Sequence, residues 1–299
     1  MNNRSKKHHY LPRYYLKGFT NTSGGFFVYD KRTDKIFSSS PGATFFENDL
    51  NTMVLPRIGP SDFLEKLYED TESGFWMFLD RIRNSKPELP IELVDKMHLF
   101  LFLSFLHWRL PGNLEHIEKL SEEIMPDGEG VFDYVILKNS NGDRTPEEIL
   151  RKLRNDSEFK KITKLIAPFA PFYKDKNWPK KLIEDWKFLY TGDGQNWYLV
   201  GDHPIISGGK NDHDPMACLS EFIFPVSGKI LLVNYGGFVK MDLSREFIIA
   251  YNTAVIARAD RFVACQNRAF LEALVKLYRF HKKFNKDDRI IKRMFGLLK

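Results

Sequence analysis

The residues most suited to acid–base chemistry lie near the start of the chain. His8, His9 and Tyr10 are consecutive, Lys7 precedes them and Arg13 follows. An imidazole can take up and release a proton near neutral pH, and cations beside it can bind phosphate oxygens. The cluster therefore predicts proton transfer at a phosphate or binding of a divalent metal ion. Adjacent side chains diverge on a strand or a helix, so we expect one imidazole to act at a site and the other to be structural. The alternative is an N-terminal tail with a chance pair of histidines or a fragment of an expression tag.

A second candidate is a carboxylate that follows a predicted strand. Asp202 and His203 come directly after residues 197–200, and Pro204 prevents that strand from continuing. Side chains at strand ends can project into a cleft without disrupting a sheet. We predict that Asp202 acts as a catalytic carboxylate or as a metal ligand together with His9, and that His203 contacts the substrate. The alternative is a surface turn with a solvated histidine.

Two charged residues lie within predicted helices that are otherwise apolar. Glu72 precedes Gly74, which permits close approach by another element, and Arg109 ends an apolar helix in front of Pro111. An arginine in this position can pair with a carboxylate or hold a phosphate. It can also simply cap the carbonyl groups at the end of its own helix, and that interpretation remains open.

Composition narrows the class of protein. The 299 residues are 43% hydrophobic and contain 45 Lys and Arg against 39 Asp and Glu. The excess positive charge is concentrated in residues 4–17 and 279–299. The C-terminal cations are compatible with a nucleic-acid partner and equally with a solvated helix face, so the charge indicates the N-terminal site more than it indicates nucleic acid. The N-terminal residues lack a secretion signal, and the longest apolar run, residues 97–110, is interrupted by polar side chains, so we expect no membrane span. Two cysteines, Cys218 and Cys265, exclude a disulfide framework and favour buried thiols in a cytoplasmic protein.

Apolar spacing and turn residues predict an α+β fold: a central helical bundle flanked by an antiparallel sheet from N-terminal and C-terminal strands. We expect one domain over residues 1–299, helical at about 61–185 and mainly sheet at about 1–60 and 186–299. The first hairpin is expected to rejoin the C-terminal sheet. The predicted helices cover 61–84, 91–110, 113–124, a segment starting at Thr145, 243–257 and 267–283. The predicted strands are 26–29 with 35–38, 186–190 with 197–200 as a hairpin, 222–224 with 230–233, and 261–264.

One motif resembles a known family. Residues 8–19 read HHYLPRYYLKGF and resemble the HHYxPxxYLxxF start of a bacterial family, domain of unknown function 4238. The resemblance spans nearly the whole chain, because later features follow in the same order as in the family. These later features are the helix with Glu72, the Arg-x-Pro sequence at 109–111, the Asp-His-Pro sequence at 202–204, the Phe-Pro-Val-Ser turn at 224–227 and Asn252 followed by residues 259–263.

The resemblance implies that both N-terminal histidines are native, but it implies no activity. Family members usually carry Asn at the position of His203, which moves the expected catalytic role to Asp202. Standard nucleotide-binding and hydrolase signatures are absent from the sequence.

The leading functional hypothesis is a hydrolase acting on a phosphodiester, namely a nuclease for RNA or DNA. A divalent metal ion on His9 and Asp202 is one form of the mechanism, and a metal-free histidine mechanism is the other. The alternative function is a non-catalytic binding or effector module whose polar network is structural. Substrate, metal dependence and oligomeric state stay open. The predicted catalytic residues are His8, His9, Tyr10, Glu72, Arg109 and Asp202, and the predicted substrate-binding residues are Lys7, Arg13, His203 and Asn252.

Overall fold

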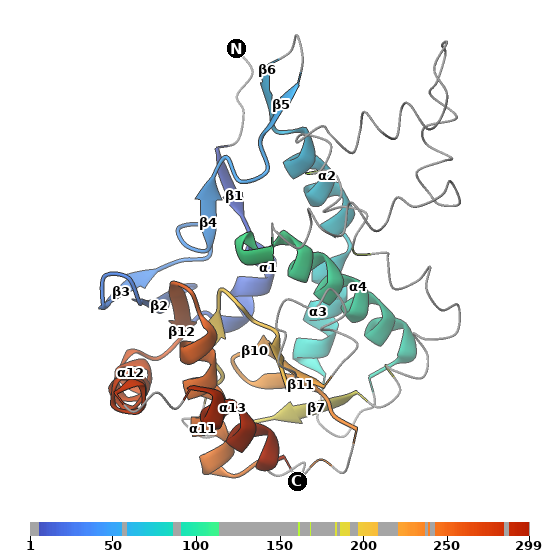
Figure 1. The fold of residues 1–299 in the computed structure, drawn as a ribbon. Coiled ribbons are helices and arrows are strands. Elements are labelled where there is room, and N and C mark those ends of the chain that lie inside the picture. The colour runs from blue at the N-terminus through green and yellow to red at the C-terminus, as the bar shows by residue number, and fades with distance from the viewer. Residues whose placement is uncertain are drawn as a thin grey trace, which may run out of the picture.

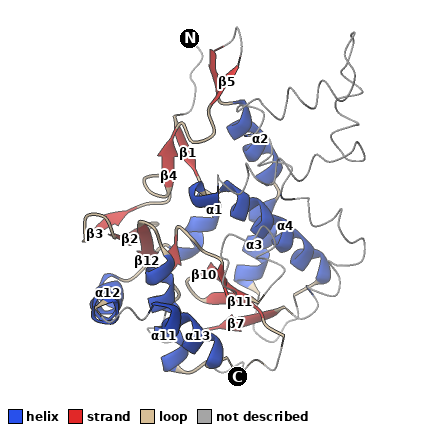
Figure 2. Ribbon diagram, in the orientation of Figure 1, coloured by secondary structure: helices blue, strands red, loops and turns tan. Residues whose placement is uncertain are grey.

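A computed structural model gives the fold of most of the chain. It describes residues 6–55, 59–85, 91–113, 186–191, 197–208, 221–236, 243–283 and 287–298, together with the single positions 161, 168, 183 and 239. The predicted helices at 113–124 and from Thr145 fall almost entirely outside these ranges, as does Cys218. Within them the fold is α+β, as the sequence predicts (Figure 2).

The helices follow the apolar spacing of the sequence, with one difference. The single helix predicted over 61–84 is two helices, because Ser73 and Gly74 form a turn between them. The predicted helix at 91–110 is confirmed. No helix in the described ranges combines the length and apolar character needed to cross a bilayer. The α-helices are α1 (Arg13–Leu16), α2 (Phe63–Glu72), α3 (Phe75–Asn84), α4 (Leu93–Arg109), α11 (Arg245–Arg258), α12 (Arg268–Lys282) and α13 (Asp287–Gly296).

One four-stranded antiparallel sheet joins the two ends of the chain. Its order is β3 (Lys35–Ser39), β2 (Phe26–Asp30), β12 (Phe262–Cys265) and β8 (Val200–Gly201). The predicted N-terminal hairpin is β2 with β3, and its pairing with β12 confirms that it rejoins the C-terminal strands. Cys265 in β12 is a free, buried thiol, and burial raises its pKa to about 12.

A second four-stranded sheet contains β7 (Lys187–Tyr190), β11 (Ile230–Asn234), β10 (Phe222–Ser227) and β9 (Ile206–Ser207), in that order. The predicted pairing of 222–224 with 230–233 is confirmed. The predicted hairpin of 186–190 with 197–200 is wrong, because β7 pairs with β11 while Val200 belongs to β8 in the other sheet. Both segments are extended, but each pairs with a strand distant in the sequence.

Helices cover both faces of the second sheet, so its strands are buried on both sides. In β10, Phe222 and Phe224 pack into a core with α3 and α4, and Ile223 between them packs into a core with α11 and α13. This alternation follows from the period of two along a strand. Figure 1 shows α3 and α4 on one side of β10 and β11, and α11 and α13 on the other.

Two short strand pairs complete the N-terminal part. The strand β1 (Lys7–His9) pairs antiparallel with β4 (Phe46–Asn48), and β5 (Met53–Leu55) pairs with β6 (Gly59–Ser61). Figure 1 shows β1 leading directly into α1, with α2 and the end of α4 close by. The N-terminal motif therefore lies next to the helices that carry Glu72 and Arg109.

Candidate functional site

Strand geometry separates the two adjacent histidines. In β1, His8 lies opposite Glu47 and His9 lies opposite Phe46. The His8 side chain is fully buried, and its Nδ1 accepts a 2.8 Å hydrogen bond from the backbone N–H of Asn51. The His9 ring packs 5.5 Å from the ring of Phe46 and lines a pocket. The two imidazoles thus have different neighbours, as expected for adjacent positions on a strand.

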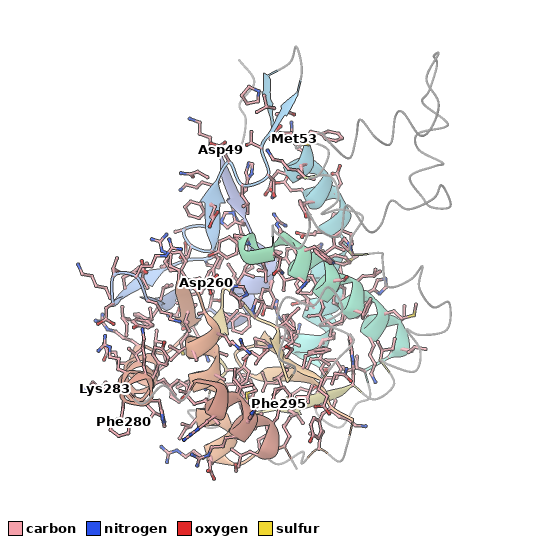
Figure 3. All side chains as sticks on the ribbon, viewed as in Figure 1. Asp49, Met53, Asp260, Phe280, Lys283 and Phe295 are labelled. Atoms are coloured by element: carbon pink, nitrogen blue, oxygen red, sulfur yellow. The ribbon has the colours of Figure 1, made fainter. Side chains whose placement is uncertain are left out.

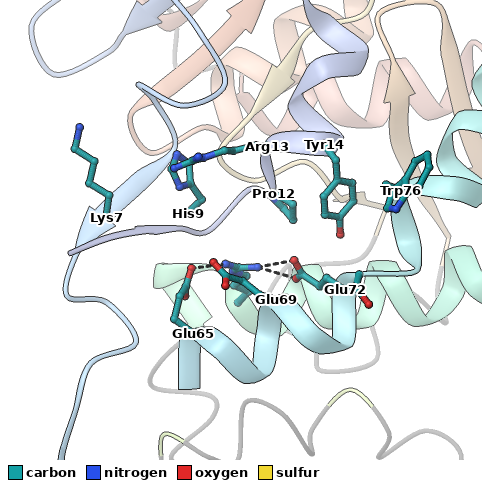
Figure 4. A pocket seen from close by; sticks show the side chains of 11 residues that line it. Lys7, His9, Pro12, Arg13, Tyr14, Glu65, Glu69, Glu72 and Trp76 are labelled. Atoms are coloured by element: carbon teal, nitrogen blue, oxygen red, sulfur yellow. Dashed lines mark hydrogen bonds and ion pairs between the residues drawn. The ribbon is translucent and has the colours of Figure 1, made fainter. Parts of the chain in front are cut away.

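The pocket has a volume of about 300 Å³ and lies between the β1–α1 segment and α2. Figure 4 shows Lys7, His9, Arg13 and Tyr14 along one side and three glutamates of α2 along the other, with Trp76 at the far end from Lys7. A volume of this size is at the lower end of the range found for small-molecule sites. The lining residues are Lys7, His9, Pro12, Arg13, Tyr14, Glu65, Glu69, Glu72, Ser73, Trp76 and Arg109.

Helix periodicity explains the row of carboxylates. Glu65, Glu69 and Glu72 are four and three positions apart, and this spacing places them on one face of α2. Glu65 and Glu72 are buried and Glu69 is exposed. The pocket therefore has two carboxylates enclosed by protein and one that faces solvent.

Arg109 holds the two buried carboxylates together. Its Nη1 donates to both oxygens of Glu72 at 2.7 Å, and its Nη2 donates to Glu65 at 3.0 Å. Glu65 also accepts a 2.8 Å hydrogen bond from the side-chain amide of Asn51. The guanidinium lies over the ring of Tyr68, 4.8 Å from its centroid. A buried charge needs such partners, so the network fixes the end of α4 against α2.

Burial and the charges around the pocket determine the protonation state of His9. Burial, and after it the charges of Arg13, Arg109 and Lys7, lower the pKa of His9 to about 4. The imidazole is therefore neutral at pH 7. Its Nε2 is shielded from solvent and has no hydrogen-bond partner among the described residues. Across the pocket, burial and the charge of Glu72 raise the pKa of Tyr14 well above its usual value.

A buried arginine on α3 positions the backbone of α1. Arg83 donates from Nη1 to the carbonyl of Tyr14 at 3.0 Å and from Nη2 to the carbonyl of Tyr15 at 2.7 Å. Its Nε and Nη2 also donate to the carbonyl of Val226 in β10, at 3.2 and 3.0 Å. Burial lowers the pKa of Arg83 to about 10, so it stays protonated at neutral pH. The arginine thereby links α1, which carries Arg13 and the pocket wall, to the second sheet.

Asp202 lies outside the pocket, and its carboxylate accepts hydrogen bonds from backbone N–H groups. Its Oδ1 accepts from the N–H of Asp260 at 2.8 Å, and its Oδ2 accepts from the N–H groups of Arg261 and Phe262 at 2.7 and 2.8 Å. These bonds fix the loop between α11 and β12 to the end of β8. The side chain is buried, and burial raises its pKa. The structure therefore places Asp202 in a structural contact and not among the residues around His9.

His203 packs against the turn that follows Arg109. A Cβ added to Gly112 would lie 3.1 Å from the imidazole, so the glycine permits this approach. The Nε2 of His203 is 2.8 Å from the carboxylate of Asp260, which lies just past the end of α11 (Figure 3). Burial opposes its charge, but Asp260 raises the pKa of His203 above its usual value. The Asp-His-Pro and Arg-x-Pro sequences thus lie side by side, while His203 is directed at Asp260.

Two further predicted residues, Tyr10 and Asn252, lie in the core of the fold. Tyr10 is 4% exposed and packs against Phe45 in the core, and it does not line the pocket. Asn252 is fully buried in α11, where it accepts from the N–H of Leu199 and donates to the carbonyl of Trp197, both at 2.8 Å. Of the predicted set, the pocket brings together Lys7, His9, Arg13, Glu72 and Arg109.

Several pocket residues were not among the sequence predictions. Glu65 and Glu69 share the helix face of Glu72, a signal that is readable from their spacing. Tyr14 follows Arg13 within the N-terminal motif. Trp76 has no sequence signal of its own, because a tryptophan in an amphipathic helix is normally a core residue; here it is 54% exposed.

No group of three His, Cys, Asp or Glu side chains within the described ranges is placed to hold a metal ion. His9 and Asp202, the two predicted metal ligands, have separate surroundings: the pocket for His9 and the backbone N–H groups of residues 260–262 for Asp202. The chemistry of the pocket is thus that of a neutral imidazole, exposed cations and one exposed carboxylate.

Comparison with known proteins identifies the family. The model of a family described as protein of unknown function (DUF4238) matches residues 7–269. No curated protein and no solved structure matches the chain significantly. Because the match covers most of the chain, including the pocket residues of β1, α1, α2, α3 and α4, the protein belongs to this family.

Proposed function

We propose that this member of the family is a phosphodiester hydrolase, a nuclease whose active site is the pocket between β1, α1 and α2. The observation that carries the proposal is His9. It is an imidazole kept neutral by burial and neighbouring cations, with an unpartnered nitrogen, at a pocket that also contains Lys7 and Arg13.

The cations provide the binding energy for a phosphate. Lys7 and Arg13 are exposed and line the same side of the pocket as His9. Charge-assisted hydrogen bonds from both side chains would orient a phosphodiester and stabilise the negative charge that builds up on its oxygens in the transition state. Arg109 is already paired with two carboxylates, so we assign it the role of holding α2 in place.

His9 serves first as base and then as acid. The neutral imidazole accepts a proton from the attacking oxygen, which belongs to water or to an RNA 2′-hydroxyl, as that oxygen bonds to phosphorus. The bond from phosphorus to the leaving oxygen breaks, and the leaving oxygen takes a proton from the imidazolium. The nearby cations destabilise the imidazolium, which favours the second transfer. A bound phosphate offsets those cations and brings the pKa of His9 closer to neutral pH.

A specific observation also favours the alternative function. Asp202, Asn252 and the Arg109–Glu72 pair all make structural contacts, so much of the family motif is used to stabilise the fold. On this view the pocket binds an anionic ligand without cleaving it. The proposed enzyme and the binding module share the phosphate site and differ in whether His9 transfers a proton.

A cleavage assay on single-stranded RNA and DNA tests the proposal. We expect cleavage by the wild-type protein and at least a tenfold loss in a Lys7→Ala, Arg13→Ala double variant. Lys35→Ala, on an exposed position of β3 outside the pocket, is the matched charge control and should cleave normally. Repeating the assay with a chelator separates metal-dependent from metal-independent cleavage. Ligand binding with no cleavage of either substrate would support the binding module instead.

A further inference from the structure

The order of side chains along the pocket points to a particular ligand. We propose that the pocket holds one ribonucleotide unit, with its phosphate at Lys7 and Arg13, its ribose beside Glu69 and its base stacked on Trp76. This inference rests on the proposed function and narrows its substrate from a nucleic acid in general to single-stranded RNA.

Trp76 supplies a surface for stacking. It is the second residue of α3, directly after the turn that separates α3 from α2, and 54% of its surface is exposed. Exposure alone does not mark a binding residue, but Trp76 also lines the pocket, so its ring is available there to a flat ligand. Base–aromatic stacking depends little on base identity and contributes strongly to single-strand binding.

Glu69 lies between the two ends of the pocket. Figure 4 shows it between Glu65 and Glu72, with Lys7 towards one end and Trp76 at the other. Arg109 binds Glu65 and Glu72, whereas Glu69 is exposed. A carboxylate accepts hydrogen bonds from hydroxyl groups, and ribose lies between phosphate and base in any nucleotide. Hydrogen bonding to a 2′-hydroxyl is how a protein distinguishes RNA from DNA at one position.

The polarity of the pocket supports this orientation. The cations lie at the β1–α1 side, where they lower the pKa of His9, and the carboxylates lie on α2. A phosphate placed at the cationic end also lies next to His9, the residue that would act on it. The reverse orientation would leave the base among the cations and direct the phosphate towards the exposed indole.

Calorimetric binding of three small probes to the full chain tests the inference. The probes are adenosine 5′-monophosphate, its 2′-deoxy form and ribose 5-phosphate, which lacks a base. We expect the ribonucleotide to bind at least tenfold more tightly than ribose 5-phosphate and several-fold more tightly than the deoxynucleotide. Trp76→Ala should abolish the preference for the ribonucleotide over ribose 5-phosphate, and Trp76→Phe should keep most of that preference. Glu69→Ala should abolish the preference for the ribonucleotide over the deoxynucleotide.

A neighbouring variant is the matched control. Met77→Ala removes another exposed apolar side chain of α3 that does not line the pocket, so it should leave all three affinities unchanged. Equal binding of the ribonucleotide and ribose 5-phosphate, unaffected by Trp76→Ala, would overturn the inference and leave the phosphate site of the proposed function intact. Equal binding of the ribo and deoxy forms would overturn the assignment of Glu69. If none of the probes binds, the proposed function fails as well.

Discussion

Arg109 and Glu72 form a buried ion pair in which one guanidinium nitrogen lies 2.7 Å from both carboxylate oxygens. The pair joins the end of α4 to the end of α2, so the wall of the pocket opposite His9 depends on it. The exposed fractions of the two side chains are 4% and 7%, which means that neither charge can be solvated if its partner is lost.

Removing one member of this pair should destabilise the protein strongly. We expect Arg109→Met to lower the free energy of unfolding by about 3–5 kcal/mol, because two carboxylates would remain buried without their cation. Glu72→Gln should have a smaller effect, since Glu65 still pairs with the arginine. In the double variant the loss should be at least about 1 kcal/mol less than the sum of the single losses. Urea denaturation of the four proteins measures this coupling, and additive losses would show that the pair is not coupled.

Because Asp202 lies outside the pocket, we expect its replacement to lower the stability of the protein without lowering its cleavage activity. Asp202→Ala leaves three backbone N–H groups without their acceptor and should lower the free energy of unfolding by about 3 kcal/mol. Cleavage per folded molecule should stay near the wild-type rate. Asp260→Ala is the control, because its carboxylate is largely exposed and pairs with His203, so its loss should cost less than about 1 kcal/mol. Full stability combined with lost cleavage in Asp202→Ala would return this residue to the catalytic set.

Gly18 is predicted to be intolerant of a side chain. A Cβ there would lie 2.5–2.7 Å from the guanidinium of Arg83, which is held in place by the carbonyls of Tyr14, Tyr15 and Val226. Gly18→Ala should therefore destabilise by about 2 kcal/mol and displace the pocket wall at α1. Gly74→Ala is the matched control, since its added Cβ meets no atom within 4 Å. Thermal unfolding compares the two, and equal melting temperatures would contradict the role of Arg83.

Stability should fall as the pH is lowered from about 6.5 towards 4. The pKa of His9 is about 4 in the folded protein and near 6.5 when the residue is solvated, so in this range the unfolded chain binds a proton that the folded chain does not. The free energy of unfolding therefore increases with pH through this window, and the contribution of His9 is constant above it. His9→Asn should show a shallower slope over the same range. Identical slopes would mean that His9 titrates normally in the folded protein.

Local patterns in the sequence predicted most elements but not all of their partners. The β2–β3 and β10–β11 pairs and helices α4, α11 and α12 follow directly from apolar spacing and capping residues. The hairpin of 186–190 with 197–200 was wrong because an extended segment carries no information about which distant strand it will pair with. The division of 61–84 into two helices has a local signal in Ser73–Gly74, a sequence that often interrupts a helix.

The site was predictable in part for similar reasons. The N-terminal motif pointed to Lys7, His9 and Arg13 because their chemistry is evident from residue type. The role of Asp202 was not predictable, since a carboxylate that binds three backbone N–H groups has the same local sequence as a catalytic one. Trp76 was missed because whether an aromatic residue faces the core or a pocket depends on tertiary packing.

The two adjacent histidines lie in different surroundings, so comparing their variants tests most directly whether His9 transfers the proton in the proposed reaction. His9→Asn should reduce cleavage of single-stranded RNA by at least about a hundredfold while the protein stays folded, as expected when a general acid–base is removed. His8→Asn removes the acceptor for the N–H of Asn51, so it should lower the melting temperature and leave the cleavage rate of the folded protein within a few-fold of wild type. The decisive measurement is the cleavage rate of folded His9→Asn relative to that of folded His8→Asn. We expect a ratio far below one, and equal rates would rule out His9 as the residue that transfers the proton.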